Sequence, residues 1–196
     1  KNTEQLVKRM QRISERYARI LVVRVDLAYP LNFQDRVNIQ TFNDDMRVLR
    51  RRLQNQDTIF KGLIEYAWAL EQGAKKGYHC HLLLIYDPSK RQNDWYLADQ
   101  VWQLWQSITG NLGWYFNCNT TEHKQKFMRN NRLGVGNIQC NVQLEVSNAF
   151  NTGMYLVNPE KYAQHLRAKI PYMRSFGTGQ FEVHWRRGVA QTLQQC

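Results

Sequence analysis

The sequence predicts an α+β fold in which helices cover a central antiparallel β-sheet. Strand-like segments outnumber the strand–helix–strand units from which parallel sheets are built. Two of these segments flank a short turn, "QGAKKG" at residues 72–77, whose glycines are typical of a β-hairpin. A sheet built from hairpins buries apolar faces under helices, so we expect helices layered on a sheet.

The first half of the chain contains a helix, a strand and a second helix. Residues 3–18 have helical spacing, and we expect this helix to be an appendage to one domain that spans residues 1–196. The β-branched run "RILVVRVDLAY" at residues 19–29 predicts a central strand. Residues 32–56 predict a single helix, with an apolar stripe formed by Val37, Phe42, Met46 and Leu49.

The second half begins with the hairpin and continues with shorter elements. The first hairpin strand covers residues 63–71, and the second ends before Asp87. A helix is predicted over residues 94–110, ending at Gly110. The remaining predictions are strands at 111–119 and 135–147, a short helix at 147–158 capped by Ser147, and a last strand at 176–187.

Composition limits the class of protein. With 196 residues, 43% of them hydrophobic, the chain is long and apolar enough to form a globular domain. No apolar stretch approaches the roughly 20 residues that cross a membrane. The four cysteines are scattered without a Cys-x-x-Cys pair. This favours free thiols in a reducing cytosol over a disulfide framework or a zinc site.

Basic residues exceed acidic ones, 27 to 16, which gives a net charge of +11. Such an excess favours a polyanionic partner, most often a nucleic acid, while a solvated basic face or an anionic lipid surface is the alternative. Arginine binds phosphate with two hydrogen bonds and stacks on bases. The segment "RSFGTG" is either a phosphate-binding loop or a plain turn. The candidate DNA-binding residues are Arg24, Arg50, Arg51, Arg52, Lys75, Lys76 and Arg174.

The stretch "YHCHLLLIYD" places two histidines one residue apart in an apolar strand. Because side chains alternate along a strand, His79, His81 and Leu83 share one face. Two neutral imidazoles on one face of a rigid strand can bind a single divalent metal. The alternative is that one histidine is a hydrogen-bonded core residue and the other faces solvent.

Glu71 is a candidate third ligand. In a tight hairpin it lies almost opposite Tyr78 and His79. Two imidazoles and one carboxylate leave coordination positions open, as catalytic sites do, and mixed nitrogen and oxygen ligands suit Mn²⁺ or Mg²⁺. A shift of the pairing by one residue would turn Glu71 to the other face, where it would be a surface turn residue.

Arg24 and Asp26 share one face of the strand at residues 19–29. A charged pair on a core strand is either part of a functional site or a buried pair whose members satisfy each other.

Several segments of the chain, taken in order, resemble one known family. They are "VVRVDLAYP", "LEQGAKKGYHCHLLLIYD", "VWQLWQSITGNLGWYFNCN", "LGVGNIQ", and "YLVN" followed by "RSFGTG". This set covers about residues 19–179. It resembles the HUH endonucleases, and more narrowly the inovirus gene 2 replication proteins and the YagK/YfjJ-like catalytic domains of prophages. The resemblance implies the RRM/ferredoxin-like sheet of HUH enzymes.

The resemblance implies a catalytic domain that nicks single-stranded DNA at an origin. A tyrosine forms a 5′-phosphotyrosine link, the freed 3′-hydroxyl primes rolling-circle replication of a phage, prophage or plasmid, and the link is later reversed. A phenol with a pKa of about 10 is a poor nucleophile at neutral pH, so a divalent metal, Mn²⁺ or Mg²⁺, is expected to assist. The expected partners are single-stranded or hairpin origin DNA and a host helicase or polymerase, with no membrane, in the cytoplasm of a bacterial host.

The tyrosine that matches the family motif is Tyr155, in "MYLVN". The family usually has a lysine three residues later, where this chain has Asn158. Lys161 is a candidate substitute for that lysine, and Tyr162 is a second candidate nucleophile. Asp26 matches a family position on the first strand, where it either orients a histidine or is structural.

Two other functions stay open. Loss of the motif lysine would leave an origin-binding protein that does not cleave, and such a protein binds DNA with a steep salt dependence. A metal-dependent nuclease that activates water would cut DNA without a tyrosine nucleophile.

Overall fold

A computed structural model describes residues 2–73, 77–158, 165–167 and 170–179. Its helices are α1 (Asn2–Arg16), α2 (Ile39–Asn55), α3 (Asp94–Ile108), α4 (Thr121–Met128) and α5 (Gln143–Met154). Its strands are β1 (Arg19–Ala28), β2 (Leu63–Gly73), β3 (Gly77–Tyr86), β4 (Trp114–Asn117), β5 (Gly136–Gln139) and β6 (Phe176–Thr178). Short 3-10 turns occupy Leu31–Arg36, Thr58–Phe60 and Tyr155–Val157.

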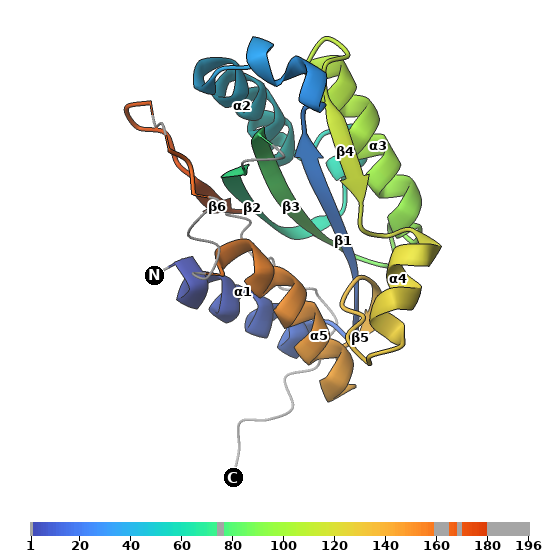
Figure 1. Cartoon of the computed structure of the whole chain (residues 1–196). Coiled ribbons are helices and arrows are strands. Elements are labelled where there is room, and N and C mark those ends of the chain that lie inside the picture. The colour runs from blue at the N-terminus through green and yellow to red at the C-terminus, as the bar shows by residue number, and fades with distance from the viewer. Residues whose placement is uncertain (1, 74–76, 159–164, 168–169, 180–196) are drawn as a thin grey trace.

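The strands form one antiparallel sheet in the order β4-β1-β3-β2-β6, which confirms the predicted α+β class (Figure 1). β5 pairs with the first half of β1, and β4 pairs with its second half. The predicted hairpin is the β2–β3 pair, whose register runs from Leu63 opposite Tyr86 to Gly73 opposite Gly77. The longest and most buried strands therefore lie at the centre of the sheet.

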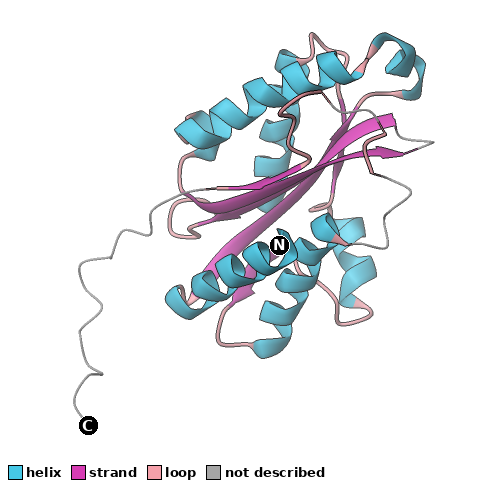
Figure 2. Ribbon diagram, turned by 90° about the vertical axis from the view of Figure 1, so that its left-hand side faces the viewer, coloured by secondary structure: helices cyan, strands magenta, loops and turns pink. Residues whose placement is uncertain are grey.

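Helices cover both faces of the sheet (Figure 2). α2 and α3 pack on one face, where Val23 and Leu82 belong to the larger hydrophobic core. α1 and α5 pack on the other face, where Val22 and Leu83 belong to a second core. We call this second face the site face. Figure 1 shows α1 and α5 crossing its lower part, below β4 and the upper ends of the central strands.

The helix that was expected to be an appendage packs on the site face. Leu6, Met10 and Ile13 are buried there, at the 3.6-residue spacing of an amphipathic helix. Arg9 on the same helix forms an ion pair with Glu65 of β2 at 2.5 Å.

The predicted helix over residues 32–56 is wrong at its start. A 3-10 turn occupies Leu31–Arg36, and α2 begins only at Ile39. Asn38 is extended and its side chain accepts a hydrogen bond from the amide of Thr41, so it caps α2 and separates the two segments.

The predicted strand over residues 135–147 is also wrong in its second half. β5 ends at Gln139, whose amide donates to the carboxylate of Glu145 instead of to a neighbouring strand. α5 begins at Gln143, so Ser147 lies inside the helix and does not cap it. The alternating apolar residues Ile138, Cys140 and Val142, which favoured a single strand, run from β5 through a turn to the residue before α5.

One helix was not predicted, and part of the last strand lies outside the described residues. α4 follows Thr120, whose hydroxyl accepts a hydrogen bond from the amide of His123 and caps the helix. Of the strand predicted at residues 176–187, only β6 falls within the described chain.

Cys80, Cys118 and Cys140 are free thiols, as predicted, and Cys196 lies outside the described residues. Burial raises the pKa of the Cys80 thiol, which therefore stays protonated in the core. Among the helices described, none has the length and apolar character required to span a bilayer.

We expect Gly134→Ala to weaken the packing of α5 on the sheet. A Cβ at Gly134 would collide with the backbone carbonyl of Asn148 in α5, which cannot rotate away as a side chain can. Overpacking of this kind reduces the free energy of unfolding by about 1–3 kcal/mol. The loss is measured by urea denaturation followed by circular dichroism.

Gly110→Ala is the matched control. A Cβ at Gly110 meets nothing within 4 Å, so this change leaves only the cost of a left-handed residue, with φ of +60°, or about 1 kcal/mol. An equal or smaller loss for Gly134→Ala would show that α5 does not depend on this close approach.

Candidate functional site

The candidate ligands come together because of the strand register. Glu71 of β2 lies directly opposite His79 of β3, and His81 lies opposite Ala69 of β2 on one side and Asp26 of β1 on the other. Residues directly opposite each other in an antiparallel pair share a face. All four polar side chains therefore project from the site face, where each is buried.

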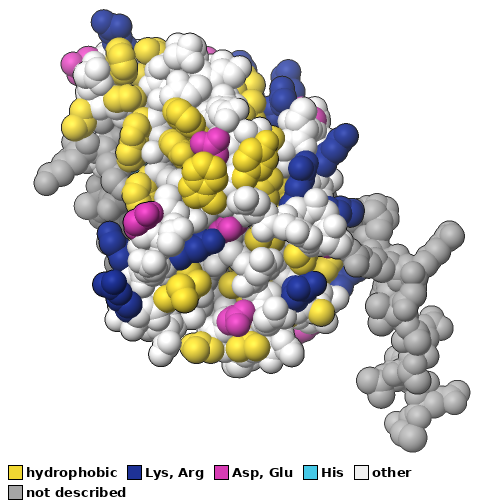
Figure 3. Space-filling model, turned by 90° about the vertical axis from the view of Figure 1, so that its right-hand side faces the viewer, with side chains coloured by type: hydrophobic (Ala, Val, Ile, Leu, Met, Phe, Trp, Pro, Cys, Tyr) yellow, Lys and Arg dark blue, Asp and Glu magenta, His cyan; other side chains and the backbone are white. Residues whose placement is uncertain are grey.

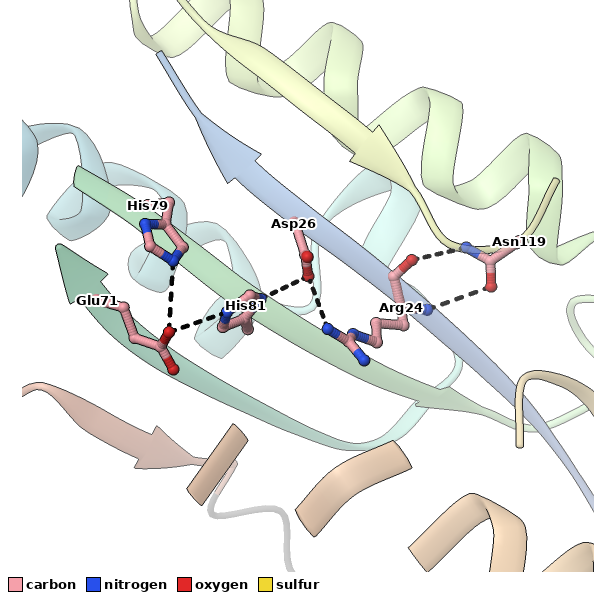
Figure 4. A network of polar contacts seen from close by, with 6 residues as sticks. All are labelled: Arg24, Asp26, Glu71, His79, His81 and Asn119. Carbon is pink, nitrogen blue, oxygen red and sulfur yellow. Dashed lines mark hydrogen bonds and ion pairs between the residues drawn. The ribbon is translucent and has the colours of Figure 1, made fainter. Parts of the chain in front are cut away.

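Glu71, His79 and His81 form a compact group (Figure 4). The Oε2 atom of Glu71 lies 3.2 Å from Nε2 of His81 and 3.4 Å from Nε2 of His79. One ligand atom from each residue lies within 4.8 Å of the other two. The group has the size and the donor set to hold one divalent metal ion.

The hydrogen bonds of the two rings fix which nitrogens are free to bind a metal. Nδ1 of His79 donates to the carbonyl of Gly77 at 3.0 Å, and Nδ1 of His81 donates to the carboxylate of Asp26 at 2.6 Å. In a neutral imidazole the other nitrogen, Nε2, then carries a lone pair. Both lone pairs point to the same oxygen of Glu71, which is also an acceptor.

Three acceptors that face one another in a buried space need a cation between them. Nε2 of His79 is buried and makes no hydrogen bond with any described residue. A buried lone pair without a partner is costly unless a proton or a metal bridges it to the Glu71 carboxylate. The residues present therefore fit a metal ion, and the arrangement in which Nδ1 of a ligand histidine is held by a carbonyl or carboxylate is the usual one in metal sites.

Arg24 extends the group along β1. Its guanidinium lies 3.4 Å from the Asp26 carboxylate that holds His81. Burial opposes its charge, but the pKa of Arg24 is nevertheless raised because Asp26 and the neighbouring groups favour the charged form. The site thus combines a cationic side chain with a group of metal ligands.

Tyr155 lies against this group. It begins the 3-10 turn that follows α5, and the residue is 39% exposed. The ring meets that of His81 edge to face, with 5.2 Å between centroids, and the Arg24 guanidinium carbon lies 4.1 Å from its centroid. The fold therefore brings the motif tyrosine to the candidate ligands, although 74 residues separate it from His81 in the sequence.

Asn119 was not among the predicted site residues. Its side-chain amide donates to the carbonyl of Arg24 at 2.8 Å and accepts from the amide of Arg24 at 3.3 Å. It therefore pairs with β1 as a strand would, just beyond the end of β4 (Figure 4). The polar alternation "NCN" after a strand is the signal that could have indicated this role.

The predicted DNA-binding residues are distributed over three places. Arg24 lies in the site, and Arg52 pairs with Asp57 at 2.8 Å. Arg50, Arg51 and Arg174 line a groove of about 1240 Å³ formed by α2, β2 and the segment through β6. Lys75 and Lys76 lie outside the described residues, as do the catalytic candidates Lys161 and Tyr162.

This arginine groove is strongly basic. Arg47 lines it together with the three predicted arginines, and none of its described lining residues is acidic. The guanidinium carbon of Arg50 lies 5.1 Å from the centroid of the Trp68 ring. The pKa of Arg50 is lowered by burial and by the like charges of Arg174 and Arg47. An anion in the groove would relieve this repulsion.

We expect Mn²⁺ to bind to the Glu/His/His group, and isothermal titration calorimetry measures it. His81→Ala should abolish binding because it removes a ligand. Asp26→Asn should reduce the affinity about 10- to 100-fold because the amide holds the His81 ring less well than the carboxylate does. His123→Ala is the control, since His123 is not one of the clustered ligands. Equal affinities for wild type and His81→Ala would contradict a metal site here.

Comparison with known proteins gives one match. The family model for the YagK/YfjJ C-terminal domain matches residues 2–179, which include all the helices and strands described above. No curated protein and no solved structure matches the chain. The match confirms the YagK/YfjJ part of the predicted resemblance. The chain belongs to the YagK/YfjJ C-terminal domain family, a prophage-type family.

Proposed function

We propose that the protein is a metal-dependent HUH-type endonuclease that nicks and rejoins single-stranded DNA at a replication origin. In this proposal it initiates rolling-circle replication of a phage, prophage or plasmid. The observation that carries the proposal is the position of Tyr155, which packs against both His81 and Arg24 beside a buried group of metal ligands. Membership of a prophage-type family agrees with such a role.

The reaction exchanges one phosphate ester for another. The phenol oxygen of Tyr155 forms a bond to the scissile phosphorus as the bond from phosphorus to the 3′-oxygen breaks. The phenol loses its proton to solvent and the 3′-oxygen gains one, leaving a 3′-hydroxyl and a 5′-phosphotyrosine. Attack by that 3′-hydroxyl reverses the step and rejoins the strand.

The chain's own residues position the reacting groups. Glu71, His79 and His81 would hold Mn²⁺ or Mg²⁺, which supplies positive charge to polarise the phosphate. Asp26 fixes the ring of His81 through its Nδ1 atom. Arg24 lies over the ring of Tyr155, where its charge stabilises the negative charge that the phenol oxygen gains. Arg24 thereby supplies the positive charge that the missing motif lysine would, since Asn158 stands in its place.

A covalent-adduct assay tests this function. Labelled single-stranded and hairpin oligonucleotides from the chain's own replicon are mixed with the protein and Mn²⁺, then run on a denaturing gel. We expect a band that survives denaturation, requires Mn²⁺ and is lost in Tyr155→Phe, because the variant has no hydroxyl to attack phosphorus. Tyr172→Phe is the control, since Tyr172 is fully exposed and outside the site.

Three results would contradict this assignment. An adduct lost only in Tyr162→Phe would move the nucleophile. Cleavage without an adduct would indicate a nuclease that activates water. Binding without cleavage would favour the second candidate function, an origin-binding protein, which the replacement of the motif lysine by Asn158 specifically supports.

The arginine groove supports a nucleic-acid partner, and its part in binding can be measured separately. Each arginine that contacts one phosphate of a single strand contributes about 0.7 to the slope of log affinity against log salt concentration. We expect Arg51→Gln with Arg174→Gln to reduce this slope by roughly 1.4. Both side chains are exposed, so the changes leave the core intact.

Arg129→Gln with Arg132→Gln is the matched control. It removes the same charge from exposed positions that do not line the groove. An equal reduction of the slope by both pairs would mean that binding depends on net charge alone and that the groove has no special part in it.

A further inference from the structure

Two aromatic side chains project from the uncovered part of the site face. In the pairing of β4 with β1, Trp114 lies opposite Ala28 and Phe116 lies opposite Asp26. Opposite residues share a face, so Phe116 is next to Asp26 across the strand pair, and Asp26 holds His81. Tyr115 alternates to the other face and stacks on Trp102.

Both residues are unusually accessible for large aromatic side chains in a β-sheet. Trp114 is 45% exposed and Phe116 is 42% exposed. The ring centroids of Phe116 and His123 are 5.3 Å apart, and those of His123 and Phe127 are 4.9 Å apart. We call Trp114, Phe116, His123 and Phe127 the aromatic platform. In Figure 3, exposed hydrophobic side chains gather over the part of the surface formed by α3 and β4.

Trp114 and Phe116, the strand residues of the platform, lie on an edge strand that has no further strand beside it within the described chain. β4 is the end strand of the sheet, and no described strand pairs with its outer edge. An exposed apolar edge strand promotes aggregation, and natural proteins usually cover it or place charges on it. Large exposed aromatics in this position are therefore typical of a binding surface.

The platform is continuous with the candidate site through Arg24. Phe116 lies opposite Asp26 in the β4–β1 pairing, and the carboxylate of Asp26 lies 3.4 Å from the Arg24 guanidinium. That guanidinium in turn lies over the ring of Tyr155. Aromatic rings for stacking beside cations for phosphates form the usual surface for single-stranded nucleic acid. The occupant that fits both the rings and the neighbouring cations is thus a strand with unpaired bases.

We infer that Trp114 and Phe116 stack on bases of the single-stranded DNA whose phosphate is presented to Tyr155. This inference rests on the proposed function for the identity of the strand. It assigns base contacts to β4 and leaves phosphate contacts to the arginines. An oligonucleotide that lacks bases but keeps its phosphates therefore separates the two kinds of contact.

The test compares two oligonucleotides of equal length and charge, one of thymidines and one of abasic sites. Affinities are measured by fluorescence anisotropy in EDTA, where no cleavage is needed. Stacking on one aromatic ring contributes about 1–3 kcal/mol, or about 5- to 150-fold in affinity. We expect Trp114→Ala and Phe116→Ala each to weaken thymidine binding by about this factor and to leave abasic binding unchanged.

Tyr172→Ala is the control, because it removes a fully exposed aromatic ring elsewhere on the surface. Thermal unfolding verifies that the variants are folded. The inference is overturned if wild type binds both oligonucleotides equally, or if the variants lose affinity for both equally. It is also overturned if either variant converts a wild-type dimer into monomers, since the platform would then be a contact between two copies.

Failure of this inference is distinguishable from failure of the proposed function. A Tyr155-dependent adduct together with base-independent binding would retain the function and remove the platform. Base-dependent binding that requires Trp114 and Phe116, without any adduct, would retain the platform on a protein that binds DNA without cutting it.

Discussion

The site depends on one electrostatic conflict. The Oε2 atom of Glu71 lies within 3.4 Å of the Nε2 atoms of both His79 and His81. In neutral imidazoles that keep their proton on Nδ1, where it is hydrogen-bonded to Gly77 and Asp26, all three atoms are acceptors. In water this arrangement would be hydrated and harmless. In a buried pocket it requires a positive charge, and a divalent cation satisfies all three atoms at once.

The rest of the fold serves to maintain this geometry. The tight β2–β3 hairpin sets Glu71 opposite His79, and the long β1–β3 pair sets Asp26 opposite His81. A slip of one residue in either pairing would turn one partner to the opposite face. The central strands are among the most buried in the molecule, which strongly specifies their register. A rigid, doubly covered sheet is therefore the foundation of the site.

The site lies at a boundary between covered and open surface. α5 reaches it from below and ends in the turn that carries Tyr155 against Arg24. Gly134 permits this approach because it has no side chain to meet the backbone of α5. On the other side of β1 from the ligands, the same face carries the exposed side chains of Trp114 and Phe116. A strand lying on this face could contact the platform, Arg24 and the metal ligands in succession.

Local patterns were sufficient to predict the parts of the structure that follow a two-residue period. The alternation in "YHCHLLL" placed His79 and His81 on one face, and the short turn placed Glu71 beside them. The same rule failed at Ile138, Cys140 and Val142, where β5 ends at Gln139 and a turn leads into α5. An alternating pattern over only five residues does not distinguish a continuous strand from a strand followed by a turn and a helix. Here the strand ends because the carboxylate of Glu145 accepts the hydrogen bond of the Gln139 amide.

Other features depend on long-range packing and have no local signature. The contact of Tyr155 with His81 was expected only from a family resemblance, because no spacing relates the turn after α5 to β3. The exposure of Trp114 is decided by how far α1 and α5 extend over the sheet, and most tryptophans in such strands are buried. The pairing of Arg52 with Asp57 likewise separates it from Arg50 and Arg51, its neighbours in the sequence.

The most direct test of the account is to locate the metal. A crystal soaked in Mn²⁺ is measured for anomalous scattering. The account predicts a single strong peak between Nε2 of His79, Nε2 of His81 and a carboxylate oxygen of Glu71, at coordination distances of about 2 Å from each. A peak elsewhere on the protein, with a direct hydrogen bond between Glu71 and a protonated histidine at this position, would contradict it.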